Sequence, residues 1–182
     1  MSTLKVHTPD TAPAASRPIL DAVQKSYGFL PNLFGVFAES PAMAEAYSAI
    51  SKIFDKTDLT PTERQIVLMT NNRLNECTYC MAAHTTISQM QGVSADVIES
   101  LRKGTAIDNP KLEALRQFAI RINETRGFVT QNDVDAFRDA GYTQGNILDV
   151  ILGTSFKTLS NYTNHIAETP LDDAFAANIW SK

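Results

Sequence analysis

The sequence lacks the features of several large protein classes. Its longest run of adjacent basic residues is Arg102-Lys103 and its formal net charge is −4, so no basic patch for nucleic acid or anionic membrane is evident. No stretch approaches 18 consecutive apolar residues, and residues 1–15 hold no charged segment followed by an apolar one. We therefore expect a cytoplasmic protein with no signal peptide, no membrane span and no nucleic-acid partner.

Signals for β-strands are also scarce, since no run of alternating β-branched residues and no Asn-Gly or Asp-Gly hairpin turn occurs. Helix caps and stops recur instead. The 182 residues, 43% of them hydrophobic, fit one domain, and we predict an all-α fold with a flexible N-terminal arm at 1–15 and a single helical domain at 16–182. The predicted helices cover residues 16–27, 31–39, 40–54, 60–75, 77–91, 94–103, 109–126, 130–140 and 144–166.

Two of these helices carry specific expectations. Thr60-Pro61-Thr62-Glu63 is a capping box, so Glu63 is expected to serve the helix start. On the last helix the predicted buried stripe contains Ile147, Val150, Ile151, Thr154, Thr158 and Tyr162. The tail after Pro170 carries Trp180, which we expect to contribute to an interface between subunits.

Cysteine is rare, and both cysteines stand in one motif. Cys77 and Cys80 have C-x-x-C spacing, and His84 follows one helical turn later. At about 100° per residue these three positions fall within roughly 60° of one another on a helix. A helix N-terminus at Cys77 would also favour a thiolate there. The spacing predicts a redox site with nucleophile, partner thiol and base together.

The motif is consistent with two other interpretations. The cysteines could be small buried hydrophobic residues, as free cysteines often are. They could instead bind zinc with His84 and a distant His165, but the sequence has no second C-x-x-C and no H-x-x-x-H. We therefore predict no metal. His165 stands near a helix end, where a structural role and an active-site role are both consistent with the sequence.

Three segments form a recognisable combination. They are the capped helix 59–75 followed by the C-x-x-C-x-x-x-H motif, the stretches Tyr27-Gly28-Phe29-Leu30-Pro31-Asn32-Leu33 and Glu39-Ser40-Pro41, and Asn161-Tyr162-Thr163-Asn164-His165. The combination resembles the AhpD-like, peroxidase-related branch of the carboxymuconolactone decarboxylase superfamily. The resemblance implies an all-helical bundle that forms homo-oligomers, whether dimers, trimers or hexamers.

The same resemblance implies a thiol-dependent peroxidase or disulfide reductase without a bound cofactor. Cys80 would attack a hydroperoxide or disulfide substrate, Cys77 would close the disulfide and His84 would relay protons. An external dithiol or carrier protein would then reduce the disulfide. General physics leaves the order of the cysteines open, because a helix N-terminus favours Cys77 as the more acidic thiol.

The chain departs from the family pattern at two positions. Gln65 stands where family members with a proton relay have glutamate, and an amide cannot accept a proton as a carboxylate does. Tyr79 replaces a histidine between the cysteines and is expected to form a wall of the substrate pocket. The alternatives to a peroxidase are a redox-sensing or scaffold oligomer and a carboxymuconolactone-decarboxylase-type enzyme, although members of that type lack the cysteine pair.

Overall fold

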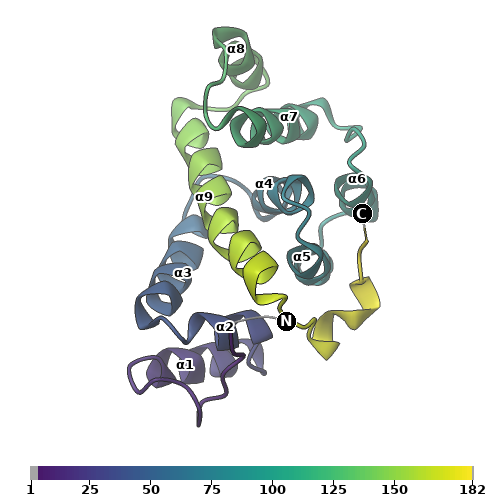
Figure 1. Ribbon diagram of the computed structural model, residues 1–182. Coiled ribbons are helices and arrows are strands. Elements are labelled where there is room, and N and C mark those ends of the chain that lie inside the picture. Colours follow the sequence, from purple (N-terminus) through teal and green to yellow (C-terminus); the bar gives the residue numbers. More distant parts are fainter. Residues whose placement is uncertain (1–3, 182) are drawn as a thin grey trace.

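The computed structural model describes residues 4–181, and over these residues it is a bundle of nine α-helices with no strand (Figure 1). A short 3-10 helix, η1 (Asp173–Asn178), follows the last α-helix. The α-helices are α1 (Arg17–Tyr27), α2 (Asn32–Phe37), α3 (Pro41–Phe54), α4 (Pro61–Leu74), α5 (Thr78–Met90), α6 (Ala95–Lys103), α7 (Pro110–Thr125), α8 (Gln131–Asp139) and α9 (Gln144–Ala167). The predicted all-α class is confirmed, with helix bounds within a few residues of those expected.

Helix α4 forms the centre of the bundle, with α5, α6, α7 and α9 packed around it (Figure 1). Every residue from Gln65 to Asn72 on this helix is buried, so α4 lacks the one-sided apolar stripe of a surface helix. Its start is the predicted capping box, in which Thr60 and Glu63 bond each other's backbone N–H groups at 3.2 and 2.8 Å. The expected role of Glu63 as a cap is confirmed.

Helix α9 is the longest helix and crosses the bundle beside α3 and α4. The approach is closest at Gly153, where an added Cβ would lie 2.7 Å from Val67 and 2.9 Å from the Phe54 ring. A glycine is therefore required at this crossing. The contact fixes which face of α9 meets the core.

That face differs from the one predicted. Ile151 and Tyr162, expected to be buried, are 42% and 56% exposed. The buried face instead carries Asn146, Val150, Gly153, Phe156, Lys157, Ser160, Asn161, Asn164 and Ala167. The prediction is confirmed at Val150 and wrong at Ile151 and Tyr162, because α9 has apolar residues on two faces and only one of them packs against its own chain.

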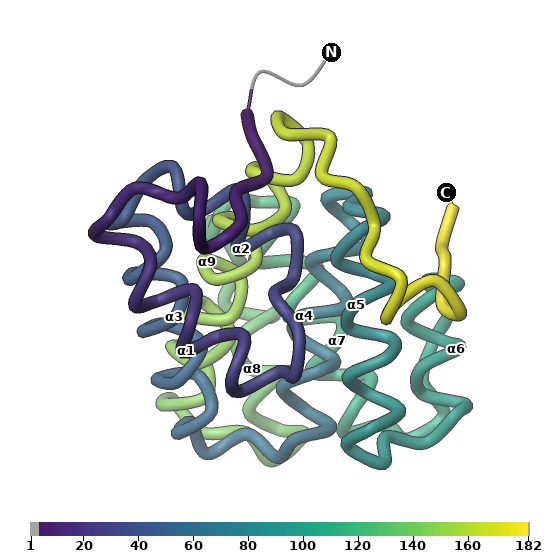
Figure 2. Tube along the Cα trace, turned by 90° about the horizontal axis from the view of Figure 1, so that it is seen from below, coloured from purple at the N-terminus to yellow at the C-terminus, as the bar shows by residue number. Residues whose placement is uncertain are grey.

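Both terminal segments lie against the bundle (Figure 2). Within the arm predicted at residues 1–15, His7 and Ala12 are buried in the structure, whereas Lys5, Thr8 and Asp10 are exposed. His7 is 7% exposed, its backbone N–H donates to the Gly35 carbonyl at 3.0 Å, and its Nε2 lies 2.6 Å from Glu39. At the other end, Trp180 packs on its own chain, donating to the Arg102 carbonyl at 3.1 Å beneath the Arg73 guanidinium. Trp180 therefore contacts its own chain, and its contribution to an interface between subunits stays a prediction.

Within residues 4–181, none of the helices combines the length and the apolar character needed to cross a lipid bilayer.

Candidate active site

The C-x-x-C motif lies at the junction of α4 and α5. The chain leaves α4 through Glu76, whose φ of 54° is left-handed, and the Cys77 N–H bonds back to the Asn72 carbonyl at 2.9 Å. Cys77 is the N-cap of α5 and Cys80 is in its first turn. This tight reversal places Cys77 at the helix N-terminus considered in the sequence analysis.

Both cysteines are free thiols and almost fully buried, with 1% exposure for Cys77 and 2% for Cys80. Their side chains hydrogen-bond each other. The bond to Cys80, followed by burial, raises the pKa of Cys77. Burial opposes ionisation of Cys80, but the bond from Cys77 and the charge of Lys157 together lower the Cys80 pKa. Cys80 is therefore the more acidic of the two thiols.

Asn164 of α9 supplies further donors to the sulfur atoms. Its Nδ2 lies 3.2 Å from Sγ of Cys80 and 3.7 Å from Sγ of Cys77. The side chain is 5% exposed, and its Oδ1 has no hydrogen-bond partner in the described structure. Hydrogen bonds of this kind favour a thiolate over a thiol.

A chain of side-chain amides, of which Asn72 and Asn161 are fully buried, links the helices of this region. Asn75 donates to Asn161 at 2.9 Å, and Asn161 donates to Asn72 at 3.0 Å. Asn72 in turn donates to the Cys80 carbonyl at 3.2 Å. Because these residues come from α4, α5 and α9, the amides fix the thiol-bearing helix relative to its two neighbours.

His84 lies one turn beyond Cys80 but makes no hydrogen bond to either sulfur in the described structure. Its Nδ1 is 2.9 Å from Oε1 of Gln65, and its Nε2 is 3.0 Å from Nζ of Lys157. An ammonium group can only donate, so Nε2 accepts and the proton of the neutral ring is on Nδ1, donated to Gln65. Burial, and then the charge of Lys157, hold the His84 pKa well below its usual value. The imidazole is therefore neutral.

Lys157 is a buried charged residue in this site that the sequence analysis missed. It is 0% exposed; burial opposes its charge, but the neighbouring acidic groups, Cys80 first, outweigh burial and raise its pKa. Its Nζ also lies 5.4 Å from the centre of the Phe156 ring. One signal was available, because Lys157 is seven residues after buried Val150 and seven before Asn164, on one face of α9.

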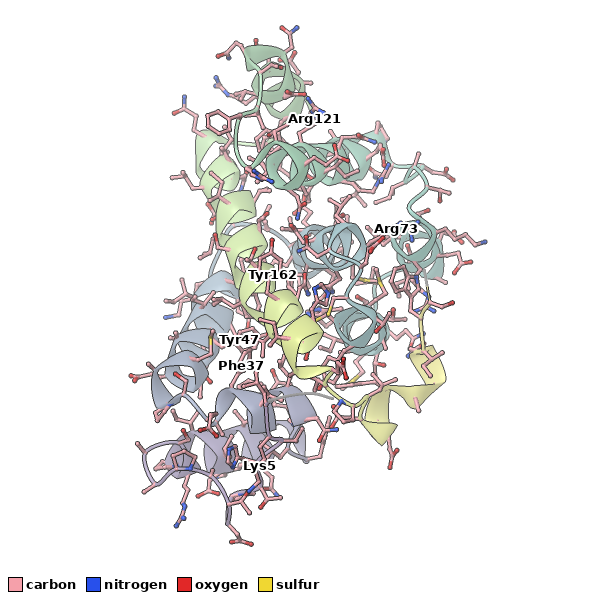
Figure 3. All side chains as sticks on the ribbon, in the orientation of Figure 1. Lys5, Phe37, Tyr47, Arg73, Arg121 and Tyr162 are labelled. Atoms are coloured by element: carbon pink, nitrogen blue, oxygen red, sulfur yellow. The ribbon has the colours of Figure 1, made fainter. Side chains whose placement is uncertain are left out.

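Cys80, His84, Lys157 and Gln65 share the wall of a cavity of about 510 Å³, whereas Cys77 does not line it. The rest of the wall is mainly apolar, with the aromatic residues Tyr27, Phe29, Phe34, Tyr47, Tyr79, Phe156 and Phe175. Figure 3 shows Tyr47 and neighbouring Phe37 where α2, α3 and α9 meet. A cavity of this volume is large enough for an organic molecule and is much larger than hydrogen peroxide requires.

The C-terminal segment covers part of this cavity, to which it contributes Ala174 and Phe175. Tyr79 lies in the wall as predicted, and its hydroxyl donates to the Asp172 carboxylate at 2.5 Å. Asp172 also accepts from the Asn32 N–H at 3.0 Å. The tyrosine between the cysteines thus joins the thiol helix, the start of α2 and the C-terminal segment.

The remaining candidates lie elsewhere. Glu63 accepts a hydrogen bond from Tyr142 at 2.9 Å, outside the cavity lining. His165 is exposed on α9 and stacks on Tyr162 with ring centres 6.4 Å apart. Across residues 4–181 no group of three His, Cys, Asp or Glu side chains is arranged to hold a metal ion. The zinc set that includes His165 is therefore not assembled.

Comparison with known proteins agrees with this architecture. The sequence model of the carboxymuconolactone decarboxylase family matches residues 41–120, which contain the C-x-x-C motif. The structure superposes, with a TM-score of 0.85 and 26% identity, on a peroxidase-related protein of Ralstonia eutropha described as an alkylhydroperoxidase AhpD core, over 96% of this chain and 94% of that one. The chain thus resembles the AhpD-like branch of the carboxymuconolactone decarboxylase superfamily in sequence and in fold.

Two further solved structures share the fold of this AhpD-like protein. A peroxidase-related protein of a Silicibacter species has a TM-score of 0.80 and 18% identity, over 95% of this chain and 92% of that one. A cysteine-to-alanine variant of the debrominase Bmp8, bound to 2,3,4-tribromopyrrole, has a TM-score of 0.78 and 18% identity, over 98% and 97%. At these identities the likeness concerns the fold alone. Among curated proteins no sequence matches the chain.

Proposed function

We propose that this AhpD-like protein is a thiol oxidoreductase that reduces an organic hydroperoxide with Cys80 as the attacking thiol and Cys77 as the resolving thiol. The observation that carries the proposal is the asymmetry of the pair. Cys80 lines the cavity and has a lowered pKa, whereas Cys77 is not part of the cavity lining and has a raised pKa. A thiolate that faces a cavity, with a second thiol in reach, has the arrangement that two-step peroxide reduction requires.

The cavity favours one substrate class among those that the family resemblance implies. Its aromatic and aliphatic lining suits a hydroperoxide with an apolar body, and the tail segment at Phe175 narrows access for a folded protein carrying a disulfide. A disulfide substrate would have to be small. The external reductant, by the same reasoning, is a low-molecular-weight dithiol or a flexible arm of a carrier protein that can enter.

The proposal extends to setting and assembly. We place the protein in the cytoplasm, where thiols stay reduced between turnovers. We also propose a homo-oligomer, because α9 presents an exposed apolar stripe on the face turned away from its own core. The stripe contains Leu148, Ile151, Tyr162 and Ile166, which are 67%, 42%, 56% and 65% exposed.

The test is the rate at which reduced protein loses thiols on mixing with cumene hydroperoxide. The proposal predicts loss of two thiols for each hydroperoxide consumed, faster than for an unperturbed thiol. Cys80→Ser should abolish the fast reaction, whereas Cys77→Ser should keep the first step and lose the disulfide. Loss no faster than that of a free thiol would contradict the peroxidase and leave a redox-sensing or scaffold oligomer, with lactone decarboxylation to be assayed separately.

Reductive dehalogenation is a second candidate, favoured by the aromatic lining of the cavity. As in hydroperoxide reduction, the two thiols supply two electrons: an aryl bromide and two thiols give the arene, the disulfide and hydrogen bromide. Mixing reduced protein with 2,3,4-tribromopyrrole and measuring bromide release tests it. Bromide release without hydroperoxide turnover would replace the first proposal by this one.

A further inference from the structure

The chemistry of the thiol pair depends on a charged residue outside the C-x-x-C motif. We propose that Lys157 is a catalytic residue whose ammonium group holds the negative charge on Cys80 and protonates the oxygen that leaves the substrate, while His84 is a positioning residue that holds Lys157. The first part concerns the reduced protein and does not depend on the proposed function: buried Lys157 and Cys80 line one cavity, and Lys157 Nζ is held 3.0 Å from His84. The second part rests on the proposed hydroperoxide reduction.

The charge of Lys157 has no conventional partner. Of the described residues that line the cavity, Asp55 is the only one with a carboxylate. Its side chain is 68% exposed and lies 3.6 Å from Arg64, so it is not a buried partner for Lys157. A fully buried ammonium without an anion is costly, and a nearby acid that ionises removes that cost. The acids that face Lys157 are the two thiols of α5 and the phenol of Tyr47 on α3. Cys80 is the one whose ionisation the other contacts favour.

The remaining titratable groups near Lys157 do not compete for this role. Tyr27 of α1 lies in the same cavity wall, and burial raises its pKa, so it stays a neutral phenol. His84 of α5 is neutral and presents a lone pair to Lys157 at 3.0 Å. The groups that face Lys157 from α1, α3 and α5 therefore leave Cys80 as its counter-ion.

The bonds of His84 explain why it acts through Lys157. Its Nε2 lone pair is occupied by the Lys157 N–H, and its Nδ1–H is occupied by Gln65. No lone pair is left to remove a proton from a sulfur. With glutamate in place of Gln65 the ring could become cationic, and it would then repel the ammonium. The amide at position 65 thus matches a site in which lysine carries the charge.

The proposed steps balance in atoms and charge. The Cys80 thiolate attacks the terminal oxygen of ROOH, the O–O bond breaks, and Lys157 gives its proton to the alkoxide to release ROH. The Cys77 thiol then passes its proton to the neutral Lys157 amine, and the Cys77 thiolate attacks the sulfenic acid of Cys80. The S–S bond forms, the S–O bond breaks, and the departing hydroxide takes a proton from Lys157 to become water. Lys157 is then a neutral amine. It regains its proton when an external dithiol reduces the disulfide and restores the Cys77 thiol and the Cys80 thiolate.

The ion-pair step is tested without any peroxide, by following thiolate absorbance and iodoacetamide alkylation across pH in the intact protein. Lys157→Met should raise the midpoint of thiolate formation by about 1–3 pH units, and Lys157→Arg should restore much of the shift. Lys103→Met, on the surface of α6, is the control and should leave the midpoint unchanged. A Lys157→Met midpoint within a few tenths of the wild type would overturn the ion pair. If Lys157→Met does not fold, Lys157→Gln gives the same comparison.

The role of His84 is read from the same titration. His84→Asn should raise the midpoint by less than Lys157→Met does, and the double variant should resemble Lys157→Met alone. Additive shifts in the double variant would show that His84 acts on the thiols independently, which would contradict the positioning role.

The proton-donor step is tested by the leaving group. Lys157→Met should slow the reaction with tert-butyl hydroperoxide, which releases a basic alkoxide, more than the reaction with peracetic acid, which releases a stable carboxylate. Rates are compared at a pH where Cys80 is a thiolate in both proteins. Equal slowing of both reactions would overturn proton donation and leave the ion pair intact. A wild type that reduces neither oxidant would refute the proposed function, while the thiolate titration would still decide the first part.

Discussion

Asn164 provides a direct measure of how much the hydrogen bonds of α9 contribute to the charge on Cys80. The substitution Asn164→Leu keeps a similar side-chain volume and removes both N–H···S contacts, at 3.2 and 3.7 Å. It also removes the buried Oδ1, which has no partner in the described structure, so we expect little loss of folding stability. The change therefore acts mainly on the thiolate.

The expected magnitude follows from the shorter contact. A hydrogen bond to a charged group contributes about 1.5–3 kcal/mol, and about 1.4 kcal/mol corresponds to one pKa unit. Asn164→Leu should therefore raise the pKa of Cys80 by about 1–2 units. The longer contact, to the neutral thiol of Cys77, adds little.

The assay is the pH dependence of iodoacetamide alkylation, with labelling of each cysteine resolved by mass spectrometry. Below the Cys80 pKa the alkylation rate falls with pH, and in Asn164→Leu the fall should begin at higher pH. Asn132→Leu, an exposed amide on α8, serves as the control for an asparagine replaced away from the site. A pH profile unchanged in Asn164→Leu, in a protein with an unchanged melting temperature, would refute the contribution of α9 to the thiolate.

Two further predictions concern stability. Gly153→Ala places a Cβ 2.7 Å from Val67 and should lower the free energy of unfolding by about 1–3 kcal/mol. Gly145→Ala, in the open first turn of α9, is the control and should not lower it. Equal denaturation midpoints for the two variants would contradict the close crossing of α9 and α4. In the folded protein His84 is neutral because its pKa lies well below 6.5, whereas in the unfolded chain it gains a proton near pH 6.5. The stability that the neutral ring contributes is therefore present above pH 6.5 and is lost as the pH falls towards the folded pKa. The free energy of unfolding of the wild type should therefore fall more steeply than that of His84→Gln, by up to about 2 kcal/mol between pH 6.5 and 5, and parallel curves in urea denaturation would show that the ring is already protonated.

Much of the helical framework could be predicted because its signals are local. The capping box at Glu63 depends on residues only three apart, and the structure has it as expected. The position of Cys77 as the N-cap of α5 likewise follows from neighbouring residues. Such features need no knowledge of which helix packs on which.

The missed features depend on long-range packing. Lys157 and Asn164 lie in the site only because α9 turns one particular face to α4, and the close approach of Gly153 to Val67 on that face is a long-range contact that the sequence does not display. With Ile151 exposed on the other face, the sequence offers two apolar stripes and no local reason to choose between them. The packed segment at His7 was missed for a similar reason, since its partner Glu39 is 32 residues away.

The central claim, that Cys80 is the attacking thiol, is tested most directly by trapping its oxidation product. Cys77→Ser and Cys80→Ser are each treated with one equivalent of cumene hydroperoxide in the presence of dimedone and examined by peptide mass spectrometry. The account predicts a sulfenic-acid adduct on Cys80 in Cys77→Ser and none on Cys77 in Cys80→Ser. An adduct on Cys77, or no adduct on either residue while free hydroperoxide persists, would contradict it.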